Sequence, residues 1–183
     1  MSCVTIWGAS CYRAHITALG ALKSVTPPTA RAMRLALIAI RGMVTMFGDN
    51  GHVVSLLHDT VEDTPVTIEL IDEYFGTFIA DCVAALTDPP LSAGNRKKRK
   101  QMVREKLANA NALVQTVKVA DLIDNTPSIL KHDPDFAVLY MQEKRELLQV
   151  LTKADSTLRQ QAIELLADAT DRPLEECARE VIG

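Results

Sequence analysis

One short segment places a histidine and three carboxylates next to a strongly apolar run. The segment His52–Asp63 has the sequence HVVSLLHDTVED. At about 100° per residue, a helix would place His58 and Glu62 on one face and Asp59 and Asp63 on the next. The apolar residues must be buried, so the charged side chains are held near the core. Because buried carboxylates are costly unless a cation or hydrogen bonds compensate them, this segment indicates a divalent metal site.

A second apolar segment carries another aspartate. Taken alone, the charges of the first segment have an alternative interpretation as the start of a solvated face, which is usual for a lone His–Asp pair. In the segment 117–125, VKVADLIDN, Asp121 and Asn125 are four residues apart and therefore share one helix face. Apolar residues cover most of the remaining circumference, which is typical of a helix buried on most sides. An aspartate there needs a partner, and the first cluster is a candidate.

These two segments resemble the motifs of a known family. The pattern HDxxED at residues 58–63, followed by KVADxxxN at residues 118–125, is similar to that of the HD-domain metal phosphohydrolases. More narrowly, it resembles the alarmone hydrolases of the RelA/SpoT type. The intervening sequence also fits, and the resemblance extends over about residues 32–153. It implies an all-α fold, a single compact multi-helix HD domain, which we expect over residues 29–183. Residues 1–28 form an N-terminal segment to which no role is assigned.

The resemblance also implies a cofactor and a role for each motif residue. His58, Asp59 and Asp121 would bind one divalent ion, which the family implies is Mn²⁺, although another divalent metal is compatible with these ligands. The metal would activate a water and polarise the phosphate under attack. Glu62 and Asp63 would position or deprotonate that water. Asn125 would hold the substrate or orient a metal ligand.

The sequence departs from the family in one place. Family members carry a further metal-ligand histidine, in a His-Pro context that follows a basic loop. Here the segment 32–45 resembles the family's first helix and leads almost directly into the HD helix, so the loop and its His-Pro are deleted. No histidine lies between His15 and His52. His52 would lie about 120° from His58 around a helix. His15 is therefore the candidate surrogate ligand, provided that the N-terminal segment folds back over the site; the alternative is an ordinary surface or partly buried histidine.

Two classes of function follow from this departure. The first is a metal-dependent pyrophosphohydrolase that removes the 3′-pyrophosphate of ppGpp-like alarmones. The second is a degenerate HD domain without catalysis that acts as a nucleotide-binding or regulatory module. A variant of the first class would hydrolyse another phosphorylated nucleotide through the same residues. Since like charges would crowd the metal-free site, we also expect Asp121→Ala to abolish metal binding but to destabilise the metal-free protein little.

Composition limits the choice of partners and of compartment. The chain has 183 residues, of which 48% are hydrophobic, and this is enough for one domain with a substantial core. A net charge of −3 gives no general attraction to nucleic acid or to an anionic membrane. The resemblance implies a small-molecule nucleotide as the partner. No apolar run approaches the length of a membrane span. The four cysteines show no CxxC spacing and predict reduced thiols in a cytoplasmic protein. The sequence does not predict an oligomeric state.

The apolar periodicity predicts helices throughout the chain. They are expected near residues 30–46, 51–63, 67–75, 77–87, 95–108, 112–126, 135–153, 155–169 and 173–181. Thr67 and Thr77 are expected to be N-caps, with Gly76 as a stop between their helices. The pair His132–Asp133 is expected to form a turn and a cap. The basic run 96–100 predicts either a solvated face, the more common case, or a contact with a polyphosphate.

Overall fold

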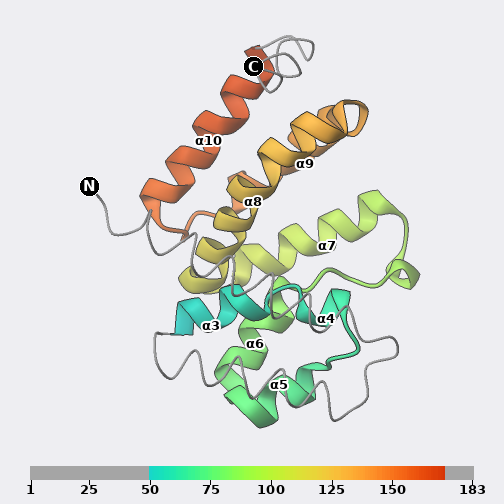
Figure 1. Ribbon diagram of the computed structural model, residues 1–183, viewed down its shortest axis with the longest axis vertical. Helices are drawn as coiled ribbons and strands as arrows, with labels where there is room; N and C mark the ends of the chain where they lie inside the picture. The colour runs from blue at the N-terminus through green and yellow to red at the C-terminus, as the bar shows by residue number, and fades with distance from the viewer. Residues whose placement is uncertain (1–49, 172–183) are drawn as a thin grey trace. The chain divides into compact units, whose positions relative to one another are not determined.

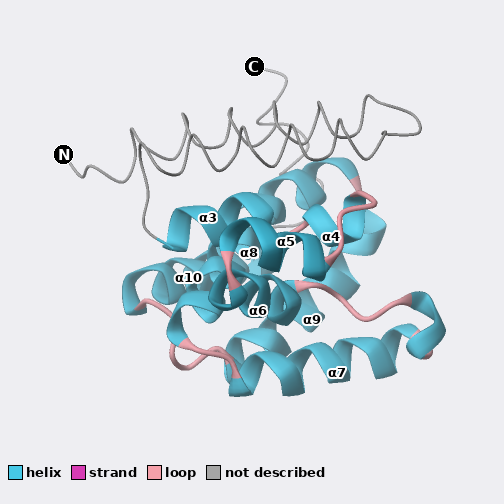
Figure 2. Cartoon of the chain, turned by 90° about the horizontal axis from the view of Figure 1, so that it is seen from below, coloured by secondary structure: helices cyan, strands magenta, loops and turns pink. Residues whose placement is uncertain are grey.

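The computed structural model describes residues 50–171, with side chains described up to residue 167. All regular structure in this range is helical, and no strand occurs in it (Figure 2), which confirms the all-α prediction. His15, the segment 1–28 and the helices expected at 30–46 and 173–181 lie outside the described residues. None of the described helices is both long and apolar enough to cross a membrane. The chain divides after Thr87 into two compact units, which are described separately below.

The first unit contains four helices between residues 50 and 87. They are α3 (Asn50–Leu57), α4 (Thr60–Asp63), α5 (Ile68–Phe75) and α6 (Thr77–Leu86). Helix α6 packs against both α3 and α5 (Figure 1). Its apolar face is buried together with those of its neighbours because the shared contact removes their side chains from water. The buried apolar residues of this unit are Val53, Val54, Leu57, Val66, Ile71, Ile79, Ala80, Cys82, Val83 and Leu86.

The single helix predicted over residues 51–63 is wrong, because the structure has two helices there. Helix α3 ends at Leu57, and α4 begins at Thr60. Asp59 lies between them with φ −97° and ψ −1°, and its carbonyl accepts hydrogen bonds from the backbone N–H groups of Glu62 and Asp63. The break falls at His58 and Asp59, two consecutive residues with weak helix propensity. These two residues are the HD pair, and the acids Glu62 and Asp63 follow the break in α4.

Three residues were expected to define the ends of α5 and the start of α6, and two of these predictions are confirmed. Thr67 caps α5, and its side-chain oxygen accepts a hydrogen bond from the backbone N–H of Leu70. Gly76 ends α5 with φ +85°, a conformation that favours glycine. Thr77 is not a cap, contrary to expectation, because Gly76 occupies the N-cap position and Thr77 is the first residue of α6. The glycine thus serves as the end of one helix and the start of the next.

The second unit begins at Asp88 and is built around a long central helix. Its elements are the 3₁₀ turn η1 (Leu91–Ala93), α7 (Arg96–Asn109), α8 (Ala112–His132), α9 (Pro134–Val150) and α10 (Ser156–Asp171). Helix α8 packs against α9 and α10, and α9 also packs against α7 (Figure 1). Asn95, Asn111 and Asp133 cap α7, α8 and α9 through their side-chain oxygens. The cap at Asp133 confirms the role expected for His132–Asp133.

Gln115 is a polar residue at the centre of the second unit. Its side chain is fully buried on α8. The amide nitrogen donates to the carbonyl of Leu107 at 2.8 Å, and the amide oxygen accepts from the backbone N–H of Lys153 at 2.7 Å. One side chain therefore joins the end of α7 to the segment that follows α9. Both of its backbone partners depend on it for these hydrogen bonds.

Replacing Gln115 with methionine is expected to lower the free energy of unfolding by about 1–3 kcal/mol while the volume is nearly kept. The backbone N–H of Lys153 loses its partner, and the Leu107 carbonyl keeps only the N–H of Ala110. Urea denaturation would measure the change. Gln101→Met is the matched control, because Gln101 is exposed on α7 and bonds only to Glu105 one turn away. A loss for Gln115→Met no larger than that of the control would contradict the bridging role.

Candidate metal centre

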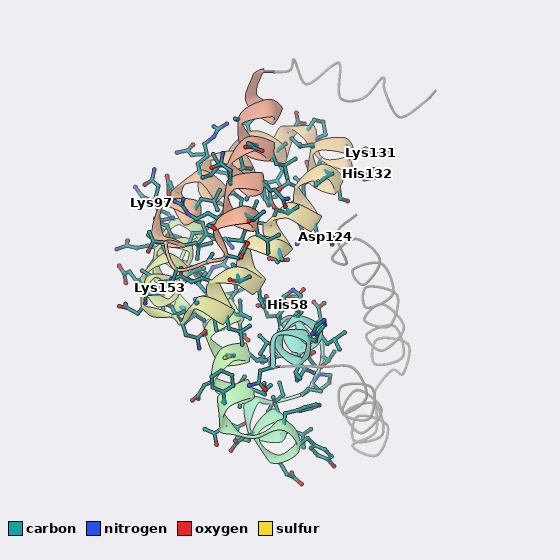
Figure 3. The ribbon with its side chains drawn as sticks, turned by 90° about the vertical axis from the view of Figure 1, so that its left-hand side faces the viewer. His58, Lys97, Asp124, Lys131, His132 and Lys153 are labelled. Carbon is teal, nitrogen blue, oxygen red and sulfur yellow. The ribbon has the colours of Figure 1, made fainter. Side chains whose placement is uncertain are left out.

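His58 and Asp59 form a close pair in the first unit. The Nδ1 atom of His58 lies 2.8 Å from the carbonyl oxygen of Ser55, one turn earlier on α3. Its Nε2 atom lies 3.0 Å from Oδ2 of Asp59. The His58 side chain is 13% exposed and that of Asp59 is 40% exposed, so the pair lies near the surface. His58, which is labelled in Figure 3, directly follows the last residue of α3.

The contacts of His58 define which ring nitrogen faces Asp59. Because a carbonyl oxygen can only accept, Nδ1 carries the proton and donates it to Ser55. In the neutral ring Nε2 is then an acceptor, and it faces a carboxylate oxygen. Two such atoms 3.0 Å apart need a proton or a cation between them. Adjacent ligands of an octahedral ion with bonds of about 2.1 Å are separated by about 3 Å. The pair therefore fits two neighbouring ligand positions of a divalent ion.

Glu62 and Asp63 follow the pair in the short helix α4. Their backbone N–H groups both bond to the carbonyl of Asp59, at 3.1 and 3.0 Å. These two hydrogen bonds hold the backbone of both acids next to Asp59. Both side chains are exposed. They are therefore accessible to water and to a substrate, as a group that positions or deprotonates water must be.

Asp121 lies on α8 in the second unit and has two partners on its own helix. Lys118 Nζ lies 3.0 Å from its Oδ2, and both side chains are nearly buried, at 12% and 11% exposed. The amide of Asn125 donates a hydrogen bond to its Oδ1. The face shared by Asp121 and Asn125, which the spacing predicted, is confirmed by this bond. The Asn125 amide thus holds one oxygen of the Asp121 carboxylate.

Sequence reasoning gave no role to two lysines that surround Asp121. Lys118 is part of the motif, but its pairing with Asp121 depends on how both side chains turn in the folded chain. Lys144 lies on α9, and its charge interacts with those of Lys118 and Asp121. No local pattern marks Lys144, because it is separated from the motif by a whole helix. Lys144 comes near Asp121 only because α8 packs against α9 in the folded chain.

The chain is similar in sequence to curated pyrophosphohydrolases over about half of its length. No protein-family model matches the chain. Among curated relatives, the guanosine-3′,5′-bis(diphosphate) 3′-pyrophosphohydrolase MESH1 of Drosophila melanogaster is 29% identical over 55% of this chain and 54% of its own length. MESH1 of Xenopus tropicalis is 35% identical over 44% of each chain. An enzyme of Spiroplasma citri with the same activity in its name is 33% identical over 54% of this chain and 14% of its own length. The chain thus spans about half or less of the curated relatives it matches.

Solved structures support the same fold. A metazoan ortholog of SpoT, described as hydrolysing ppGpp, superposes with a TM-score of 0.61 at 18% identity, covering 87% of this chain and 95% of that one. A protein of Listeria monocytogenes gives a TM-score of 0.56 at 21% identity, covering 73% and 94%. These comparisons confirm the resemblance to the HD-domain ppGpp hydrolases that the two sequence motifs indicated.

Proposed function

We propose that this protein is a metal-dependent pyrophosphohydrolase that removes the 3′-pyrophosphate of ppGpp-like alarmones. The observation that carries the proposal is the His58–Asp59 pair, whose facing atoms are spaced as two ligands of one ion and whose histidine is oriented by Ser55. The names of the curated relatives supply the substrate class. We also propose a cytoplasmic location and a small-molecule nucleotide as the substrate, with no nucleic-acid or membrane partner.

In the proposed site, His58, Asp59 and Asp121 share one divalent ion, which we take to be Mn²⁺. The ion supplies Lewis-acid polarisation of the water and of the phosphate under attack. Asn125 holds the carboxylate of Asp121 through its hydrogen bond and so limits the rotation of that ligand. Lys118 Nζ lies against Oδ2 of Asp121, so in the proposed site the ion would share the Asp121 carboxylate with this ammonium group.

Glu62 and Asp63 are the groups proposed to act on the attacking water. The backbone N–H groups of both residues donate hydrogen bonds to the carbonyl of Asp59, which is itself a proposed metal ligand. This supports a role for both acids near the ion. A carboxylate there can accept a proton from the water as the phosphorus–oxygen bond forms. Water attacks the phosphorus next to the 3′ oxygen, and the bond between that phosphorus and the 3′ oxygen breaks. The nucleotide 3′-oxygen is the leaving group and takes up a proton to give the 3′-hydroxyl, while the released pyrophosphate carries the oxygen of the water.

The decisive experiment joins metal analysis with a release assay. The purified full chain is assayed for pyrophosphate release from ppGpp in EDTA and then with added Mn²⁺. Release that depends on Mn²⁺, with about one metal bound per chain, supports the proposal. A protein that neither binds Mn²⁺ nor releases pyrophosphate would contradict it.

One observation favours the degenerate module as a second candidate. The Lys118–Asp121 ion pair neutralises the third proposed ligand without any metal. A protein that uses this pair permanently would bind the nucleotide but not hydrolyse it. Nucleotide binding by calorimetry without Mn²⁺-dependent release would identify this case.

The deleted His-Pro leads to a separate prediction. If His15 is the surrogate ligand, His15→Ala should weaken Mn²⁺ affinity about as strongly as His58→Ala, and by more than the roughly 10–100-fold that a residue behind the ligands costs. Calorimetric titration with Mn²⁺ would compare the two variants. His132→Ala is the control, since His132 is exposed at the end of α8 (Figure 3). An active protein indifferent to His15→Ala would favour a site with three protein ligands.

A further inference from the structure

Lys144 is a partly buried cation on α9 without a carboxylate of its own. It forms no ion pair with any residue in the described part of the chain. Its Nζ lies 4.9 Å from the centre of the Tyr140 ring, one turn earlier on α9, in a cation–π contact. The Tyr140 ring is in turn fixed by an edge contact with Phe136 and by the buried contact of its hydroxyl with Thr126 at 3.3 Å. The ammonium group is therefore held in place.

The neighbouring carboxylates are already paired with other cations. Asp88 Oδ2 lies 2.8 Å from Lys100 Nζ, and Asp121 is paired with Lys118. Burial alone would raise the pKa of Asp88, but the hydrogen bond and charge of Lys100 outweigh this and hold it below its usual value. The acids that flank Lys144 on α9, Glu143 and Glu146, are bound by arginines of α7.

The cluster thus holds a surplus of positive charge. Four cations, Lys144, Lys118, Lys100 and Arg96, interact with three carboxylates, those of Asp88, Asp121 and Glu143. Burial and the two other lysines lower the pKa of Lys144 to about 8. It is still largely protonated at pH 7, so among the described residues one buried cation is left without an ion-pair partner of its own. An arrangement of this kind is unfavourable unless an anion completes it.

We propose that Lys144 is a specificity-determining residue that binds a phosphate group of the substrate other than the one under attack. The ligand class is a nucleotide or polyphosphate with at least two separate phosphate groups, and in naming it as substrate this inference rests on the proposed function. Phosphate fits better than a carboxylate because its extra charge and third oxygen match several lysines at once. The Tyr140 ring fixes the ammonium direction, and the charges of Lys118 and Lys100 add electrostatic attraction for the anion.

The anion site can be tested without metal and without hydrolysis. The full chain is titrated with inorganic pyrophosphate in EDTA at pH 7 by calorimetry. The wild type should bind it saturably, and Lys144→Met should bind about 10- to 100-fold more weakly, the loss expected for one charge-assisted hydrogen bond. Lys144→Arg should retain binding within a few-fold. Lys131→Met is the control, because Lys131 is exposed at the far end of α8 (Figure 3), and it should match the wild type.

Thermal melting gives an independent measurement on the same variants. Without pyrophosphate, Lys144→Met should melt at the wild-type temperature or above it, because an uncompensated cation has been removed. With pyrophosphate, the rise in melting temperature seen for the wild type should be lost. Equal pyrophosphate binding by wild type and Lys144→Met, or no saturable binding by the wild type, would overturn the proposal. So would a variant that melts well below the wild type but still binds the anion.

The outcomes separate this inference from the proposed hydrolase activity. A protein that binds pyrophosphate through Lys144 but releases none from ppGpp with Mn²⁺ supports the anion site and contradicts only the activity. A protein that hydrolyses ppGpp equally well with Lys144→Met, with unchanged KM, contradicts only the anion site. A selective rise in KM for ppGpp with little change in kcat is the expected result for an active enzyme.

Discussion

Replacing Asp121 with asparagine is expected to abolish the rise in melting temperature that Mn²⁺ produces in the wild-type protein, and to abolish pyrophosphate release with it. The carboxylate is a proposed metal ligand, and an amide oxygen without charge is a much weaker one. For the wild type, Mn²⁺ at 100 times its dissociation constant should add about 2.7 kcal/mol of stability. Differential scanning fluorimetry with and without Mn²⁺ would measure both proteins.

The same substitution is expected to destabilise the metal-free protein, by about 1–3 kcal/mol. It leaves Lys118, whose side chain is 12% exposed, without the charge that it pairs with. From the sequence alone Asp121 is one member of a repulsive acidic cluster, and its loss should cost little. The ion pair with Lys118 reverses that expectation, because the nearest charge to Asp121 on its own helix is positive.

Asp124→Asn is the matched control for Asp121→Asn. It makes the same chemical change on the same helix, three residues later, and Asp124 is exposed (Figure 3). It should leave the metal-induced shift, the release rate and the metal-free stability unchanged. An Asp121→Asn protein that retains the full Mn²⁺-induced shift would exclude Asp121 as a ligand.

Local features of the chain could be predicted because they depend on neighbours in the sequence. Two of these features are helix caps, in which the side chains of Thr67 and Asp133 bond to backbone N–H groups three residues later. The third is the helix end at Gly76, which depends on a positive φ. The bond between Asn125 and Asp121 follows from a spacing of four on a helix. The resemblance added the all-α fold to these local details.

Features that depend on packing were missed. Helix α8 was expected to end near residue 126, but it continues through Pro127 to His132 because contacts with α9 and α10 outweigh the lost hydrogen bond. Gln115 bridges segments far apart in the chain, and Lys144 acquires its surroundings from three other segments. The role of His58, Asp59 and Asp121 as ligands of one ion stays a prediction, as do the roles of Glu62 and Asp63.

Glu62→Gln is expected to lower kcat for pyrophosphate release by about 10²–10⁴-fold while leaving Mn²⁺ affinity nearly unchanged. Glutamine keeps the size and the backbone bond to the Asp59 carbonyl, but it cannot accept a proton from water. Asp63→Asn tests the neighbouring acid in the same way. The residue that deprotonates the water should give the larger loss, and the residue that only positions it should give a smaller one.

The comparison requires metal binding to be measured on every variant. Glu73→Gln is the control, since Glu73 is an exposed glutamate on α5, away from the α4 turn, and it should behave as the wild type in both assays. If Glu62→Gln loses Mn²⁺ affinity together with activity, Glu62 holds the metal rather than the proton. If neither Glu62→Gln nor Asp63→Asn lowers kcat, the attacking water is activated without either acid. The break at Asp59, after which Glu62 and Asp63 follow in α4, would then be a feature of the fold and would have no part in catalysis.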